Sequence, residues 1–166
     1  MLVLIQVLIL DKIPLRPGIP AFTPFIYPLF ILLLPISAPT WFVLMISFFL
    51  GITLDTFADT GGIHALACLI MGASRKSILA FLLPKQLDEY KNTAPNITEM
   101  GWSPFLMFTT LLLLFHHSIF YIIEIWNLAS PVYLLVKIAT SLITTLILII
   151  IYVLLFSKSI SKTYYE

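Results

Sequence analysis

The chain has 166 residues, of which 60% are hydrophobic and only 10% are charged. A soluble domain carries roughly 45–50% apolar and about 25% charged residues, so too little polar surface is available here to cover a water-soluble core, and the expected solvent is lipid. The net charge of +1 excludes the charge excess that attracts nucleic acid. Cys68 is the only cysteine, which excludes an internal disulfide and a cysteine-rich metal site.

The first apolar segment covers residues 1–10 and stops at Asp11 and Lys12. A helix of that length rises only about 15 Å, against a hydrocarbon core of about 30 Å. It is too short to span the membrane alone, and we expect the start site to lie inside the helix. The chain begins without a basic region or a small-residue cleavage site, so no signal peptide is expected.

A proline-rich loop over residues 13–21 leads into the second apolar segment, 22–36, which contains Pro24, Pro28 and Pro35. Prolines kink a helix because they remove a backbone donor. Membrane helices tolerate them where neighbouring groups bind the freed carbonyls. We therefore expect a kinked second helix.

Four further apolar segments follow, and each reads as one helix. The longest polar stretch, residues 84–102, is expected to be a loop rather than a second domain. The sequence thus predicts an all-α polytopic membrane protein with one domain over 1–166 and about six transmembrane helices, the first shortened. The expected helices are 1–10, 22–36, 40–57, 62–83, 104–126 and 132–156.

Basic residues are divided unevenly between alternate loops. Cytoplasmic loops are enriched in lysine and arginine, so the bias predicts that both termini and the 84–102 loop are cytoplasmic. Arg75 and Lys76 are expected among the cytoplasmic headgroups, and the turns near Asp59 and Asn127 face outward. One side carries Arg75, Lys76, Lys85, Lys91, Lys158 and Lys162, and the other carries Lys12 and Arg16.

Polar groups inside lipid are costly, so each requires an explanation. Gly51 and Asp55 are four residues apart and share one helix face. The glycine lets another backbone approach, and the aspartate then lies at that contact. Asp55 is either an anchor for a partner or ligand, or a structural residue that starts the outer turn or caps the next helix.

Small residues form a stripe at the start of the fourth segment: Gly61, Ala65, Cys68 and Gly72 are spaced four, three and four apart. In lipid such stripes favour close helix packing. The partner helix is expected in this chain, with a helix of another protein as the alternative. His64 lies one turn from Cys68, and a lone histidine–cysteine pair is weak evidence for zinc.

The fifth segment carries a polar stripe of Thr110, His117, Tyr121 and Glu124, with His116 lying 100° away. Such a stripe can relay protons, bind an ion or bind a metal. The structural alternative, which we prefer, is a hydrogen-bonded seam that joins the fifth helix to its neighbours, with His64 of the fourth segment as a further member.

Lys137 in the sixth segment supplies a candidate partner for this seam. Glu124 lies three residues before the turn at 127–131 and Lys137 six after it. We therefore predict a contact between the two. Ser141 and Thr144 continue the same face of the sixth helix, so polar contacts are expected to join the hairpin.

No sequence motif pairs a nucleophile with a base, binds a phosphate or coordinates a metal at a diagnostic spacing. An enzyme would have to be assembled from Asp55, His64, His117 and Glu124 inside the membrane. We therefore expect a protein that is not an enzyme and needs no cofactor.

Two stretches resemble the MreD family of rod shape-determining proteins. Phe49–Cys68, FLGITLDTFADTGGIHALAC, is similar to the family's glycine–aspartate helix end, outer turn and following Gly-x-x-Ala helix start. His116–Asn127, HHSIFYIIEIWN, is similar to the fifth helix of some members. The opening VLIQVLILDKI resembles the family's first helix in a shortened form.

This resemblance implies a non-catalytic subunit of the bacterial inner membrane, in the elongation complex that organises lateral peptidoglycan synthesis. The implied main partner is the bitopic protein MreC. Through the complex, the implied partners are MreB filaments, the glycosyltransferase RodA and a penicillin-binding transpeptidase. No catalytic residue is implied.

Two other functions remain open. MreD-like proteins share a six-helix plan with the substrate-binding subunits of energy-coupling-factor vitamin transporters. An outward-facing cavity that holds Asp55, His64 or Glu124 would favour such a transporter. An intramembrane enzyme would need histidine and carboxylate side chains that converge on one water-filled point.

Overall fold

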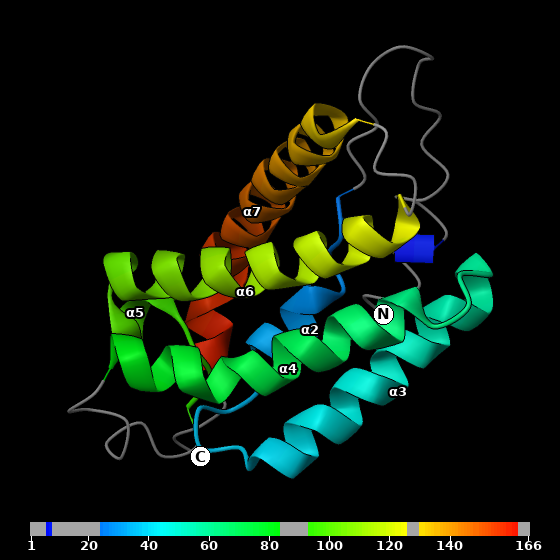
Figure 1. The fold of residues 1–166 in the computed structure, drawn as a ribbon. Coiled ribbons are helices and arrows are strands. Elements are labelled where there is room, and N and C mark those ends of the chain that lie inside the picture. The colour runs from blue at the N-terminus through cyan, green and yellow to red at the C-terminus, as the bar shows by residue number, and fades with distance from the viewer. Residues whose placement is uncertain (1–5, 8–23, 84–92, 126–129, 163–166) are drawn as a thin grey trace.

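The computed structural model describes residues 6–7, 24–83, 93–125 and 130–162, with side chains up to Phe156. Within these ranges the chain is all-α, without a strand, so the expected class is confirmed there. Figure 1 shows the arrangement of the helices. They are α2 (Pro28–Leu32), α3 (Thr40–Ala58), α4 (Ile63–Leu82), α5 (Ile97–Met100), α6 (Trp102–Glu124) and α7 (Pro131–Lys162).

Four of these helices are long and apolar enough to cross a membrane: α3, α4, α6 and the Pro131–Phe156 part of α7. The expected helix at 1–10 and the loop at 13–21 lie outside the described residues, except that Gln6 and Val7 are helical. The expected loop over 84–102 contains α5 in its described part.

The long helices pack in sequence order. α3 turns back on α4, α4 packs against α6, and α6 packs against α7 (Figure 1). The α3–α4 turn therefore lies at one end of the bundle, and α5 lies at the other, beside the end of α4 and the start of α6. These ends are called the turn end and the α5 end below.

The prediction of one helix over 22–36 is wrong in its extent, because only Pro28–Leu32 is helical among its described residues, 24–36. Pro28 occupies the first position of α2, where its missing N–H costs nothing. Pro35 cannot continue the helix and disfavours the helical conformation at the residue before it. The prolines thus divide this stretch into an irregular part, one helical turn and a second irregular part. We call residues 24–39 the discontinuous segment.

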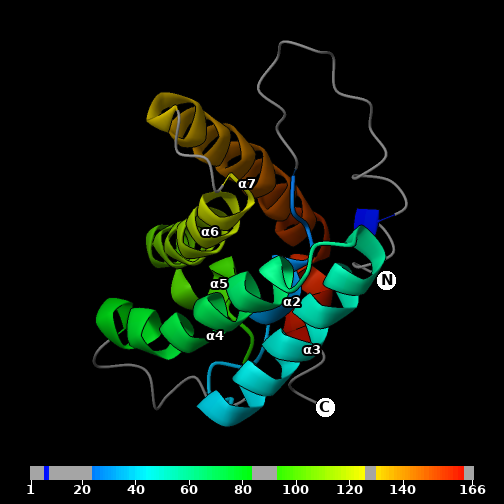
Figure 2. The ribbon, with the colours of Figure 1, turned by 45° about the vertical axis from the view of Figure 1, so that its right-hand side comes forward.

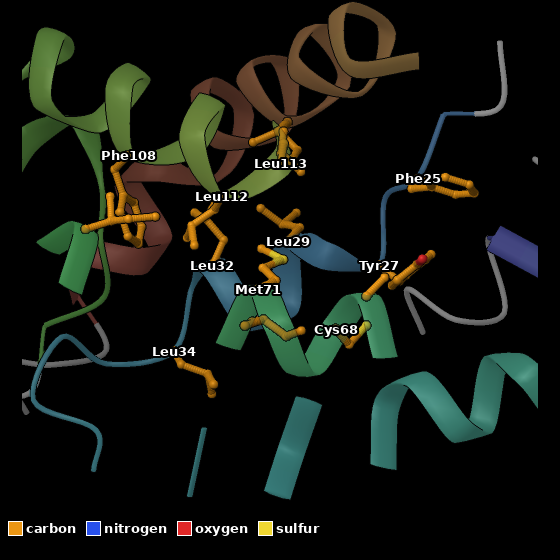
Figure 3. Close-up of a cluster of buried hydrophobic side chains, with 14 of the residues drawn as sticks. Phe25, Tyr27, Leu29, Leu32, Leu34, Cys68, Met71, Phe108, Leu112 and Leu113 are labelled. Atoms are coloured by element: carbon orange, nitrogen blue, oxygen red, sulfur yellow. The ribbon is translucent and has the colours of Figure 1, made fainter. Parts of the chain in front are cut away.

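The discontinuous segment forms the centre of the bundle. Its side chains at Tyr27, Leu29, Ile31 and Leu32 are fully buried. α2 contacts α3, α4 and α6. Figure 1 shows α2 between α4 and α6, and Figure 2 shows it behind α4 and beside α3. In Figure 3 Leu29 and Leu32 lie between Met71 of α4 and Leu112 of α6. Irregular backbone is tolerated at membrane depth when protein surrounds it, as here.

Side chains of distant elements bind the free backbone groups at the beginning of this segment. The N–H of Phe25 donates to Oγ1 of Thr145 in α7, at 3.0 Å. The side chain of Gln6 accepts from the N–H of Ile26 at 2.9 Å and donates to the carbonyl of Pro24 at 3.2 Å. These bonds replace those that a continuous helix would make internally.

Arg75 of α4 binds the other end of the segment. Its guanidinium donates to the carbonyl oxygens of Leu34 and Pro35, the second at 3.2 Å. We predicted that Arg75 lies among headgroups, but its side chain is only 2% exposed and lies over the ring of Phe108. The prediction of headgroup exposure is therefore wrong for Arg75, since its donors satisfy carbonyls that the break in the helix leaves free.

Candidate functional site

Gly51 and Asp55 lie where α3 approaches α4 most closely. A Cβ on Gly51 would lie 2.6 Å from the backbone nitrogen of Ala65 and 2.8 Å from the carbonyl oxygen of His64. Any side chain at this position would therefore separate the two helices. The expectation that the small residues pack within this chain is confirmed here.

The carboxylate of Asp55 caps α4. Its oxygens accept from the N–H of His64 at 3.0 Å, from the N–H of Ala65 at 2.9 Å, and from the hydroxyl of Thr60 at 2.6 Å. The first N–H groups of a helix have no partner within the helix, and a negative charge is favourable there. The structural alternative for Asp55, a cap on the next helix, is confirmed.

Three members of the predicted stripe of small residues, Ala65, Cys68 and Gly72, are buried on α4. Gly72 faces α3, where a Cβ would lie 2.5 Å from Oγ of Ser47. Gly61, however, precedes the helix and is exposed in the turn, with φ +59°. Gly61 therefore serves the turn conformation, which glycine adopts without strain, and not the helix contact.

The predicted polar seam joins α6 to α7. Nε2 of His117 lies 3.2 Å from Oγ1 of Thr145, and the hydroxyl of Tyr121 donates to Oγ of Ser141 at 2.8 Å. Thr110, at the other end of the stripe, is half-buried.

The predicted contact between Glu124 and Lys137 is confirmed. Nζ of Lys137 lies 2.7 Å from Oε2 of Glu124, and it also lies 4.7 Å above the ring of Tyr121. This ion pair is partly exposed, with 41% of the glutamate side chain accessible. The seam therefore ends in a charged pair beside the α6–α7 connection.

His64 does not join this seam. Its Nδ1 lies 2.7 Å from the hydroxyl of Tyr27, and the same hydroxyl lies 2.8 Å from Nε2 of His116. Tyr27 and His116 are fully buried, and His64 is 5% exposed. The discontinuous segment is thus joined to both α4 and α6 by one hydroxyl, and we call these three residues the Tyr27 triad.

Sequence reasoning missed Tyr27 and Thr145, and it set His116 aside because it lies off the stripe of α6. The 100° offset of His116 from the stripe could have indicated its role, because it directs the ring of His116 toward another neighbour than the one that His117 contacts. Tyr27 follows Pro24 and precedes Pro28, in the stretch that the kinked-helix interpretation treated as regular.

Aromatic rings fill the space between the polar side chains. The ring centroid of Phe25 lies 5.9 Å from His64, 5.7 Å from His116 and 5.4 Å from His117. Phe120 lies 4.8 Å from Phe25 and 4.7 Å from His64. In the described part of the chain, no three His, Cys, Asp or Glu side chains converge to hold a metal ion. The arrangement can hold the segment in place and move protons between hydrogen-bonded atoms.

Comparison with protein-family models, with curated proteins and with solved structures finds no match to the chain.

Proposed function

We propose that the chain is a non-catalytic subunit of a membrane complex and acts by binding other membrane proteins through its helix surfaces. The observation that carries this proposal is that both residues of the glycine–aspartate motif make their contacts within the chain. Gly51 admits the backbone of α4, and Asp55 caps that helix. The motif that resembles the MreD family therefore builds a helix pair, and its carboxylate is already occupied by backbone N–H groups.

The outer surfaces of the bundle support the same function. α3 and α7 each present large apolar side chains on the face that points away from the core. In a membrane these faces contact lipid or the helices of a partner, and helix association there depends on packing rather than on charge. On α3 they are Trp41, Met45, Phe48, Phe49, Ile52 and Phe57, and on α7 they include Leu135, Ile143, Ile147, Ile151 and Leu155.

With the MreD resemblance, the proposal becomes specific. The chain would lie in the bacterial inner membrane, with both termini and the α5 end cytoplasmic, and would organise lateral peptidoglycan synthesis. Its main partner would be MreC, and the complex would contain MreB, RodA and a penicillin-binding transpeptidase. Lys76, which is exposed near the α5 end of α4, fits a cytoplasmic position for that end.

Affinity capture tests this proposal. The tagged protein is isolated gently from native membranes, and its partners are identified by mass spectrometry, with an unrelated multi-pass protein carrying the same tag as the control. Specific recovery of MreC with the wall-synthesis proteins is expected. Recovery without any of them contradicts the proposal.

One observation favours a second candidate, the substrate-binding subunit of an energy-coupling-factor transporter. Many transporters build their substrate site from a discontinuous helix and polar groups, and here the discontinuous segment carries Tyr27 to His64 and His116. The rings of Phe25 and Phe120 occupy the space where a substrate would bind. Capture of a paired ATPase with a coupling membrane subunit would establish this candidate instead.

A further inference from the structure

The three histidines of the chain lie in one cluster, and two of them contact the same hydroxyl. The hydroxyl of Tyr27 has one proton, so it can donate to only one of the two rings. The other ring must then carry its own proton and donate to the tyrosine oxygen. The tautomers of His64 and His116 are therefore linked through Tyr27.

The state of Nδ1 of His116 decides whether His116 or His64 donates to the oxygen of Tyr27. Nδ1 of His116 is buried and has no hydrogen-bond partner among the described residues. An orphaned buried N–H is rarer in proteins than an under-used acceptor, so this nitrogen is best left as a lone pair. Nε2 of His116 then donates to Tyr27, and Tyr27 donates to Nδ1 of His64.

We infer that the Tyr27 triad is a proton-binding site. When a proton binds at one end, each proton in the hydrogen-bond chain moves to the next atom. When a proton binds at Nδ1 of His116, the proton on Nε2 passes to the oxygen of Tyr27. The hydroxyl proton of Tyr27 passes to Nδ1 of His64. One proton is gained: His64 becomes the imidazolium, and His116 is neutral again with its proton on Nδ1.

Both transfers follow hydrogen bonds that already exist, at 2.7 and 2.8 Å, so no heavy atom has to move. The two protonated forms have the same proton on Nδ1 of His116 and differ only in which ring is charged. The charges and dipoles around the triad therefore decide whether His64 or His116 carries the positive charge.

The surroundings favour His64. The carboxylate of Asp55 accepts from the backbone N–H of His64, so a negative charge lies at that end of the triad. The ring of His117 is 5.3 Å from that of His116, and its Nδ1 donates to the carbonyl of Leu113. In the neutral form of His117, Nε2 accepts from the hydroxyl of Thr145. Among the described residues, the other titratable groups of this region come from four helices. Asp55 of α3 binds the backbone of His64, and Cys68 lies one turn from His64 on α4. His117 of α6 lies beside His116, and Tyr121 of α6, with Lys137 of α7 over its ring, lies behind His117.

Burial explains why the ligand is a proton. Tyr27 and His116 are fully buried, and aromatic rings fill the space beside them, so a larger ligand would have to open the bundle. Toward the α5 end, α6 continues with the fully buried Leu113 and Leu112. A proton that binds at Nδ1 of His116 therefore leaves its charge on His64, at the turn end of the bundle.

Nitrogen-15 NMR of the histidine rings tests this inference directly, because the chain has three histidines. The full-length protein, labelled in its histidines, is titrated in lipid nanodiscs from neutral pH down to the onset of acid unfolding. At neutral pH we expect the proton on Nε2 in His64 and His116 and on Nδ1 in His117. As His64 becomes the imidazolium, His116 is expected to change from the Nε2–H to the Nδ1–H form with the same midpoint, while His117 stays unchanged.

The titration of the unmodified protein decides the question alone. Protonation of His64 while His116 keeps its Nε2–H form would overturn the inference, as would the absence of any ring change before unfolding. In a Tyr27→Phe variant that folds, the link is removed, and His116 is expected to keep one tautomer throughout the titration of His64. A coupled change that persists in this variant would also exclude Tyr27 as the relay.

Discussion

Gly51 of α3 and Ala65 of α4 are in backbone contact: a Cβ on Gly51 would lie 2.6 Å from the nitrogen of Ala65. This contact brings Asp55, one helical turn further along α3, to the N-terminus of α4. Because the glycine and the aspartate are four residues apart, the close approach of α3 to α4 also places the carboxylate that caps α4. The two helices cannot separate without exposing the cap.

Gly51→Ala is expected to lower the free energy of unfolding by about 3 kcal/mol, because the added methyl meets backbone, which cannot rotate away. Unfolding in mixed micelles measures the change. Gly72→Ala is the matched control: its methyl meets Oγ of Ser47 at 2.5 Å, and adding Ser47→Ala should restore most of the stability. A Gly51→Ala protein as stable as the parent would show that α3 and α4 are not in backbone contact.

Asp55→Asn is expected to lower the free energy of unfolding by about 1–3 kcal/mol, because the amide nitrogen cannot accept from a backbone N–H and leaves one of them unpaired. Hydrogen exchange at the amides of His64 and Ala65 should become faster. Asp59→Asn is the control, since Asp59 is exposed and asparagine tolerates its left-handed conformation (φ 55°). Equal effects of the two changes would refute the cap.

Arg75→Gln is expected to cost about 2–4 kcal/mol, because it leaves the carbonyls of Leu34 and Pro35 without their donors in a buried position. The adjacent Lys76 is exposed, and Lys76→Gln should change the stability by less than about 0.5 kcal/mol. Thermal unfolding in nanodiscs compares the two. If the lysine change proves as costly as the arginine change, the loss of a positive charge, and not the loss of carbonyl donors, is responsible.

Thr145→Val keeps the shape of the side chain but removes the hydroxyl that joins Phe25 to His117. The expected loss is about 1–3 kcal/mol, since a buried backbone N–H and a ring nitrogen lose their partner together. Thr144→Val is the control, because the hydroxyl of Thr144 bonds carbonyls of its own helix. Unfolding midpoints that are the same for both variants would contradict a role for Thr145 in holding the segment.

Glu124→Gln is expected to be mild, at less than about 1 kcal/mol, because the pair with Lys137 is partly exposed and exposed ion pairs contribute little. Unfolding at low and high salt should show that the difference shrinks as salt rises. The exchanged pair, Glu124→Lys with Lys137→Glu, should recover the parent stability. A large loss that the exchange does not recover would point to a direct role of Glu124 in binding a partner.

The long helices could be predicted from the sequence because length and hydropathy are properties of contiguous residues. The bounds of α3, α4 and α6 agree with the prediction to within two residues, whereas α7 (Pro131–Lys162) continues past the predicted end at 156. Gly51 and Asp55 could be placed on one helix face, and Glu124 could be paired with Lys137, because in each pair the two residues are close in sequence.

The discontinuous segment could not be predicted in the same way. Its hydropathy resembles that of a helix, and its prolines are compatible with a kink as well as with a break. What decides between these is whether other side chains can bind the freed backbone groups. Those side chains are far away in sequence, and a basic residue such as Arg75, taken with its sequence neighbours alone, indicates a membrane boundary.

The discontinuous segment also restricts the order in which the protein can be assembled. A stretch with free backbone groups is unstable alone in hydrocarbon, and the partner of Phe25 is Thr145, 120 residues later in the chain. During synthesis the segment therefore emerges well before the helix that completes it. Its final insertion must wait until α4, α6 and α7 have entered the membrane, so the residues made early are among the last to reach their native positions.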